Sequence, residues 1–155
     1  MKKMLIVLLM IMPAALAAGN LGVGVILGSP TGLSLKYLVS QSSALSAHAG
    51  WSFINTAGIH VTADYQHLFP VVFTTEEGAT IDDFTPYIAV GGRFRFKEVE
   101  GVEDDTEFHL GVRMGGGIEY NVSRFGIFLE VMPVVDVIPS TDFDLEGGLG
   151  FLFYF

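Results

Sequence analysis

The sequence contains no cysteine, few basic residues and only one continuous apolar run. Without cysteine the chain has neither a disulfide framework nor an attachment site for a cysteine-linked lipid anchor. Its 8 Lys and Arg residues stand against 17 Asp and Glu residues, so the formal net charge is −9. A chain this acidic is a poor partner for nucleic acid, whose phosphates require positive charge. We therefore expect no nucleic-acid binding.

The continuous apolar run, residues 4–11, is too short to be a membrane-spanning helix, which needs about 20 residues. It follows Lys2 and Lys3 and leads through Pro13 to an A-x-A tripeptide at residues 15–17. This order predicts a cleaved secretory signal peptide over residues 1–17, with residues 18–155 as the mature domain. Cleavage would take the formal charge from −9 to −11, because two lysines are lost.

Hydrophobic residues make up 50% of the chain, the mean hydropathy is +0.51 and 19 residues are glycine. After Gly19 the apolar residues alternate with small or polar ones, which is the period of a β-strand. Turn-forming residues separate the alternating segments, so we predict eight antiparallel strands in up-and-down order and a single domain. The segments are residues 21–28, 33–39, 45–53, 59–66, 87–96, 108–120, 125–137 and 142–155.

The face opposite the apolar one is mostly Gly, Ala and Ser, with a few charges of both signs. A soluble barrel would present Lys, Glu, Thr and Gln to water instead. The lumen of an eight-stranded barrel is narrow and needs many small residues around a few long ones. We therefore assign the apolar face to lipid and predict an all-β, eight-stranded antiparallel transmembrane β-barrel.

The aromatic residues fall into two groups if the first strand begins at the periplasm. Such pairs of aromatic girdles mark the two interfaces of membrane barrels. The group expected near the outer interface is Trp51, Phe53, Phe94, Phe96, Phe108 and Phe143. The group expected near the inner interface is Tyr37, Tyr65, Tyr120, Phe125, Phe153 and Phe155.

The segment at residues 70–83, "PVVFTTEEGATIDD", is long for a periplasmic turn, which is usually short. It forms either a long turn or an additional hairpin that would give a ten-stranded barrel. Its apolar stretches hold five or six residues, fewer than a spanning strand needs, so the sequence favours eight strands.

The strings "GVGVILGSPTGLSLKY" and "FLEVMPVVDVIPSTDFDLEGGLGFLFYF", with "ADYQHLF" and "PYIAVGGRFRF" between them, carry a resemblance that covers essentially the whole mature chain. The chain resembles a family of small OmpA-like outer-membrane barrels of spirochaetes and other diderm bacteria. The resemblance implies an eight-stranded barrel in the outer membrane and no general catalytic activity. The terminal Phe151, Phe153 and Phe155 resemble the signal by which the barrel-assembly machinery recognises its substrates.

Seven charged residues are predicted to share the inward face and to form a ladder of ion pairs: Lys36, Asp64, Arg93, Arg95, Arg113, Glu119 and Glu130. A turn at residues 121–123 would set Gly115 opposite Glu130 and leave Arg113 diagonal to it. Unpaired buried charges cost several kcal/mol, so we expect these groups to be paired or hydrated. A structural plug of the lumen is favoured, and a narrow path for protons or ions is the alternative.

Two further groups of residues are candidate sites of chemistry. His48, His60 and His109 share the inward face and could act with Asp64 as a general base, but no Ser-His-Asp or paired-carboxylate spacing accompanies them. The acidic segment "KEVEGVEDDTE" lacks the alternating ligands of a Ca²⁺ loop, and we expect its carboxylates to form a solvent-exposed face. Its carboxylates are Glu98, Glu100, Glu103, Asp104, Asp105 and Glu107.

The sequence therefore predicts a structural or surface-interaction protein, not an enzyme, without cofactor or metal. Its expected partners are outer-membrane lipid, the barrel-assembly machinery during insertion and an unidentified surface ligand. A narrow pore is the alternative function, and a membrane-embedded enzyme is less favoured.

Overall fold

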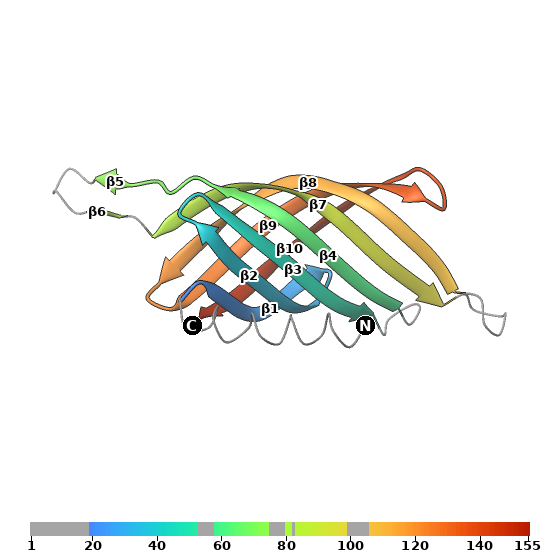
Figure 1. Cartoon of the computed structure of the whole chain (residues 1–155), viewed down its shortest axis with the longest axis horizontal. Coiled ribbons are helices and arrows are strands. Elements are labelled where there is room, and N and C mark those ends of the chain that lie inside the picture. The colour runs from blue at the N-terminus through green and yellow to red at the C-terminus, as the bar shows by residue number, and fades with distance from the viewer. Residues whose placement is uncertain (1–18, 53–57, 75–79, 82, 99–105) are drawn as a thin grey trace.

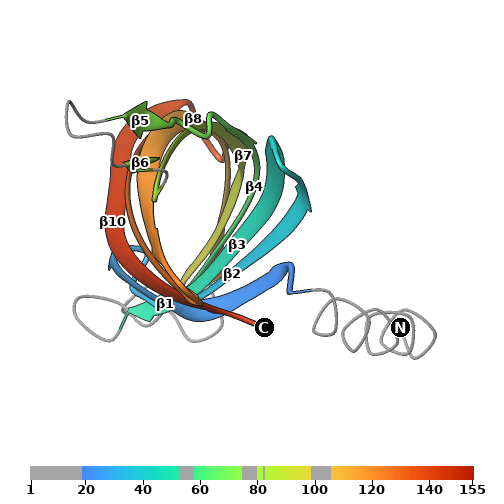
Figure 2. The ribbon, with the colours of Figure 1, turned by 90° about the vertical axis from the view of Figure 1, so that its left-hand side faces the viewer.

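The computed structural model describes residues 19–52, 58–74, 80–81, 83–98 and 106–155. Eight strands form one closed antiparallel barrel, in which each strand pairs with the next and the last pairs with the first (Figures 1 and 2). The barrel strands are β1 (Leu21–Ser29), β2 (Gly32–Ser40), β3 (Ser43–Ser52), β4 (Gly58–Leu68), β7 (Phe84–Glu98), β8 (Thr106–Val122), β9 (Phe125–Ile138) and β10 (Asp142–Tyr154). The predicted eight-stranded antiparallel barrel is confirmed.

We use the name inner end for the end of the barrel at which β1 begins and β10 ends. Figure 2 looks into the inner end and shows the ring of strands, and the opposite end is the outer end. The turn that joins β1 to β2 faces the outer end (Figure 1). Among the described residues, no helix is long and apolar enough to cross a bilayer.

The two faces of the wall differ in polarity as the alternation predicts. Leu27, Met114 and Leu129 point outward and are 55%, 68% and 54% exposed, whereas Lys36 and Arg113 point inward and are 4% and 0% exposed. This arrangement is the reverse of a water-soluble fold, because burying a charge is costly and burying an apolar side chain is favourable. The outward face is therefore suited to a lipid environment.

The long segment between β4 and β7 contains two short strands, β5 (Phe73–Thr74) and β6 (Thr80–Ile81). These pair with each other and form a separate two-stranded sheet beyond the inner end of the barrel (Figure 1). The segment is thus a hairpin, but the ten-stranded barrel that such a hairpin suggested is wrong. Strands of two residues are too short to span a bilayer, which takes about 9–11 residues.

The expected register between β8 and β9 is also wrong. Gly117, not Gly115, lies opposite Glu130, because β8 continues to Val122 and the turn consists of Ser123 and Arg124. Ser123 has a positive φ of 57°, the conformation that a tight turn requires. Moving the centre of a turn by one residue shifts the register by two, so every side chain keeps its predicted face.

Small residues in the lumen leave room for a few large ones. Phe128 is 3% exposed and stacks on His48 at a ring distance of 5.8 Å. A Cβ added at Gly150 would lie 2.1 Å from the Phe128 ring, so a glycine is needed opposite this ring. Ile26 and Leu152 complete an apolar cluster with Phe128. A second apolar cluster comprises Ala44, Leu68, Tyr87, Ala89 and Met132.

Aromatic side chains contact one another near both ends of the wall. Towards the outer end Phe108 contacts Phe94 and Phe96, at ring distances of 6.0 and 5.4 Å. At the inner end Phe153 contacts Phe125 at 5.3 Å and Phe155 at 5.1 Å. Two of the expected girdle residues, Trp51 and Phe53, have side chains outside the described ones.

Candidate functional site

The candidate site is the set of charged side chains that fills the lumen. Among the described side chains it contains four basic residues, Lys36, Arg93, Arg95 and Arg113, and six carboxylates, Asp64, Glu119, Glu130, Asp136, Asp144 and Glu146. From the inner to the outer end we describe an inner pair around Lys36, a central cluster around Arg113 and an outer cluster around Arg93.

The central cluster ties four strands together across the lumen. Arg113 on β8 places Nε 3.0 Å from Asp64 Oδ1 on β4, Nη2 3.0 Å from Glu130 Oε1 on β9, and Nη1 2.8 Å from Glu146 Oε2 on β10. Tyr87 donates its hydroxyl to Glu130 Oε2 at 3.2 Å. A guanidinium suits this position because its planar fork can serve several carboxylates at once.

The outer cluster is built on a second guanidinium. Arg93 binds Asp136 through two hydrogen bonds, Nε to Oδ1 at 3.1 Å and Nη2 to Oδ2 at 2.7 Å. Its Nη1 donates to Asp144 Oδ2 at 2.7 Å and to Glu146 Oε1 at 2.6 Å. Arg95 contacts the same two oxygens at 3.2 Å each. Glu146 therefore links the outer cluster to the central one.

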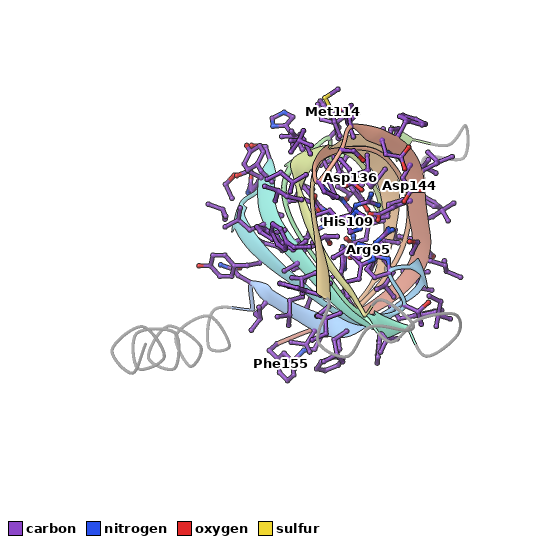
Figure 3. All side chains as sticks on the ribbon, turned by 90° about the vertical axis from the view of Figure 1, so that its right-hand side faces the viewer. Arg95, His109, Met114, Asp136, Asp144 and Phe155 are labelled. Atoms are coloured by element: carbon purple, nitrogen blue, oxygen red, sulfur yellow. The ribbon has the colours of Figure 1, made fainter. Side chains whose placement is uncertain are left out.

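Figure 3 looks into the outer end, where labelled Arg95, His109, Asp136 and Asp144 lie inside the ring of strands. Met114 and Phe155 point away from the ring in the same view. The labelled charged side chains of the outer cluster thus lie on the inner side of the wall, and the labelled apolar side chains lie on its outer side.

The inner pair is formed by Lys36 on β2 and Glu119 on β8. Lys36 Nζ lies 2.6 Å from Glu119 Oε2, and Tyr154 donates its hydroxyl to Glu119 Oε1 at 2.6 Å. The ammonium also lies 4.9 Å from the centre of the Tyr87 ring. Both side chains are at most 5% exposed, so the pair is buried and each of its charges faces an opposite one.

Each of the three lumen histidines lies beside a carboxylate that an arginine also contacts. The distances are 3.7 Å from His48 Nε2 to Glu130, 3.1 Å from His60 Nε2 to Glu146 and 3.7 Å from His109 Nδ1 to Asp136. Asp64, the carboxylate considered as their catalytic partner, contacts Arg113 instead. Within the part of the chain that the structure describes, no group of three or more His, Asp or Glu side chains is arranged to hold a metal ion.

Two cavities flank the inner pair. A vestibule of about 330 Å³ at the inner end is lined by Leu38, Leu68 and Asn121, among others. A cavity of about 10 Å³, lined by Ser34, His48 and Gln66 among others, lies on the other side of the pair and has room for about one water molecule. Lys36 and Glu119 line both cavities, so the inner pair separates them.

All seven charges that the sequence placed on the inward face lie in the lumen, and each contacts an opposite charge. Asp136, Asp144 and Glu146 also belong to this network but are not among the seven predicted charges, although their alternation places them on the inward face. Glu146 is two and four residues from Gly148 and Gly150, which share the inward face, and this spacing could have identified it as a residue of the lumen. The expected signal peptide and the carboxylates of the acidic segment at residues 98–107 lie outside the described residues and side chains.

No protein-family model matches the chain, and no curated protein matches its sequence. Among solved structures, the crystal structure of the N-terminal beta-barrel domain of Pseudomonas aeruginosa OprF matches with a TM-score of 0.67. The chain has the fold of that domain. The match covers 88% of this chain and 96% of the OprF domain at 15% sequence identity, so the likeness concerns the fold alone.

Proposed function

We propose that this chain is a small integral outer-membrane barrel whose lumen is held closed by its own side chains, with a structural or surface-interaction role. The observation that carries the proposal is the polarity of the wall, which encloses ion pairs and presents apolar side chains outward. The fold shared with the OprF barrel domain and the expected signal peptide support an outer-membrane location.

The ion pairs favour a plug over a pore. Arg113 joins carboxylates of three other strands, and Arg93 joins carboxylates of two other strands, β9 and β10, one layer further out. An ion that crossed the lumen would have to displace buried charge pairs whose partners would then be left uncompensated. The network therefore serves to brace the barrel from within.

Three partners follow from this proposal. Outer-membrane lipid covers the outward face, on which Phe151 and Phe155 are each 44% exposed. The barrel-assembly machinery recognises Phe151, Phe153 and Phe155 on the closing strand during insertion. An unidentified surface ligand remains a proposed partner of the outer loops.

Conductance in planar lipid bilayers tests the closed lumen. We expect the purified, refolded protein to give no conductance steps above those of lipid alone at neutral pH. The same sample must show heat-modifiable mobility in a detergent gel, which demonstrates that folded barrel was added. Steady conductance would contradict the plug and favour the narrow pore, and turnover in a screen of lipid and peptide hydrolysis would favour an enzyme.

A further inference from the structure

The wall of the barrel is much lower on one side than on the other. β1 and β2 hold 9 residues each, whereas β7 and β8 hold 15 and 17. Figure 1 shows the turn between β1 and β2 ending well short of the outer ends of β7 and β8. We call the outer ends of β1 and β2, at Ser29 and Gly32, the low side of the rim.

The strands on both flanks continue past the low side. β10 pairs with β1 only as far as Ser29 and Gly147, although β10 extends to Asp142. β3 pairs with β2 as far as Gly32 and Gly50 and continues to Ser52. Within the described strands, the outer parts of β10 and β3 therefore have a strand neighbour on one side only.

The low side is shorter than the apolar part of an outer membrane. Strands of one barrel share a tilt, so at about 3.3 Å per residue and a tilt near 45° nine residues rise about 20 Å and 17 residues about 40 Å. The apolar band of such barrels is about 25 Å tall. With nine residues the low side is at the short limit of a spanning strand, and at this tilt it ends roughly 5 Å below the top of the apolar band.

Carboxylates cap the strand edge above the low side. Phe155 N donates to Leu21 O on β1, so the amides of Phe143 and Leu145, which have the same parity, also point to the β1 side. β1 has ended at this level, and these amides donate to Asp142 Oδ1 and Asp144 Oδ1, each at 2.9 Å. Because carboxylates are costly in hydrocarbon, this edge requires a polar surrounding.

The outer cluster reaches the surface at the same level. Asp144 also accepts hydrogen bonds from Arg93 and Arg95, and the side chains of Asp144 and Arg95 are 41% and 20% exposed. A charged pair exposed beside a wall that is too short would meet acyl chains in a bilayer of even thickness. Headgroups and water can reach it only if the bilayer is thinner there.

We propose that the barrel thins the outer leaflet of the membrane at the low side of its rim, so that lipid headgroups descend to Ser29 and Gly32 and cover the Asp142–Leu145 edge. This inference rests on the proposed outer-membrane function. The partner is the headgroup layer of the surrounding lipid, which supplies the polar contacts that the capped edge and the exposed Arg95–Asp144 pair need.

Spin labels at two outward positions of matched height test the proposal. Leu27 lies six residues from Leu21, the residue at the inner end of β1, and Met114 lies eight residues from Val122, the residue at the inner end of β8. Both positions are therefore about 15–20 Å from the inner end along the barrel axis. The chain has no cysteine, so single Leu27→Cys and Met114→Cys substitutions label one site each. Both side chains face outward, where a label requires no repacking of the lumen.

Collision rates with oxygen and with a water-soluble nickel chelate are measured in dioleoyl phosphatidylcholine vesicles. We expect oxygen collisions to dominate at Met114, and the ratio of nickel to oxygen collisions to be severalfold higher at Leu27. In thin dilauroyl phosphatidylcholine vesicles the difference should shrink, because the whole bilayer then matches the low side.

Hydrocarbon-like values at both labels in the thick bilayer would overturn the proposal. So would a difference that does not depend on bilayer thickness, because water would then reach Leu27 without thinning. If neither label meets hydrocarbon, the barrel is not inserted, and the proposed outer-membrane function itself fails.

Discussion

Replacing Arg113 by methionine is expected to lower the free energy of unfolding by about 3–5 kcal/mol, the cost of breaking a buried ion pair by removing one partner. The substitution leaves Asp64, Glu130 and Glu146 without the guanidinium that contacts all three. Methionine fills much of the same volume as arginine. The loss of stability therefore comes mainly from the unpaired carboxylates and only to a small extent from a cavity. Urea titration of the protein in lipid vesicles, followed by the fluorescence of its single tryptophan, measures the effect.

Two further variants separate charge from packing at Arg113. Arg113→Lys keeps the charge but loses the fork of donors, so its loss of stability should be intermediate. Adding Glu130→Gln to Arg113→Met should recover part of the loss, because one stranded carboxylate becomes neutral. A loss below about 1 kcal/mol for Arg113→Met would show that the central cluster is hydrated and does not brace the barrel.

Replacing Leu129 by arginine is expected to cost about 2–4 kcal/mol, as for a cation on the lipid face near the bilayer midplane. Leu129 is 54% exposed and lies between Ile118 on β8 and Leu149 on β10, which also point outward. Leu129→Phe should cost little, because an aromatic side chain is equally compatible with acyl chains. The same urea titration in vesicles compares the two variants.

The depth of the substitution provides the matched control for Leu129. Val122 is 50% exposed and ends β8 at the inner end, so Val122→Arg should cost only about 0–1 kcal/mol. If Leu129→Arg and Leu129→Phe were tolerated equally, the outward face would not be in contact with lipid.

The side of the wall on which each residue lies was predictable from the sequence, because alternation depends only on the strand period. The β8–β9 register was not, because it depends on which two residues make the turn. The contact between Arg113 and Glu130 forms even though the predicted register is wrong by two residues, since the guanidinium reaches along the wall.

The central role of Glu146 could not be read from neighbouring strands. Glu146 on β10 meets Arg93 on β7 and Arg113 on β8, and neither of these strands is adjacent to β10. Such contacts cross the lumen and are determined by how the barrel closes, which alternation along single strands does not report. The uneven rim, in contrast, was already present in the unequal lengths of the alternating segments.

The most direct test of the account is whether the chain of residues 18–155 needs an amphiphile to fold. We predict no folded monomer in plain buffer, and in detergent micelles a β-sheet circular dichroism spectrum with heat-modifiable mobility in a gel. A stable, folded monomer in buffer without detergent or lipid would contradict the assignment of the apolar face to lipid.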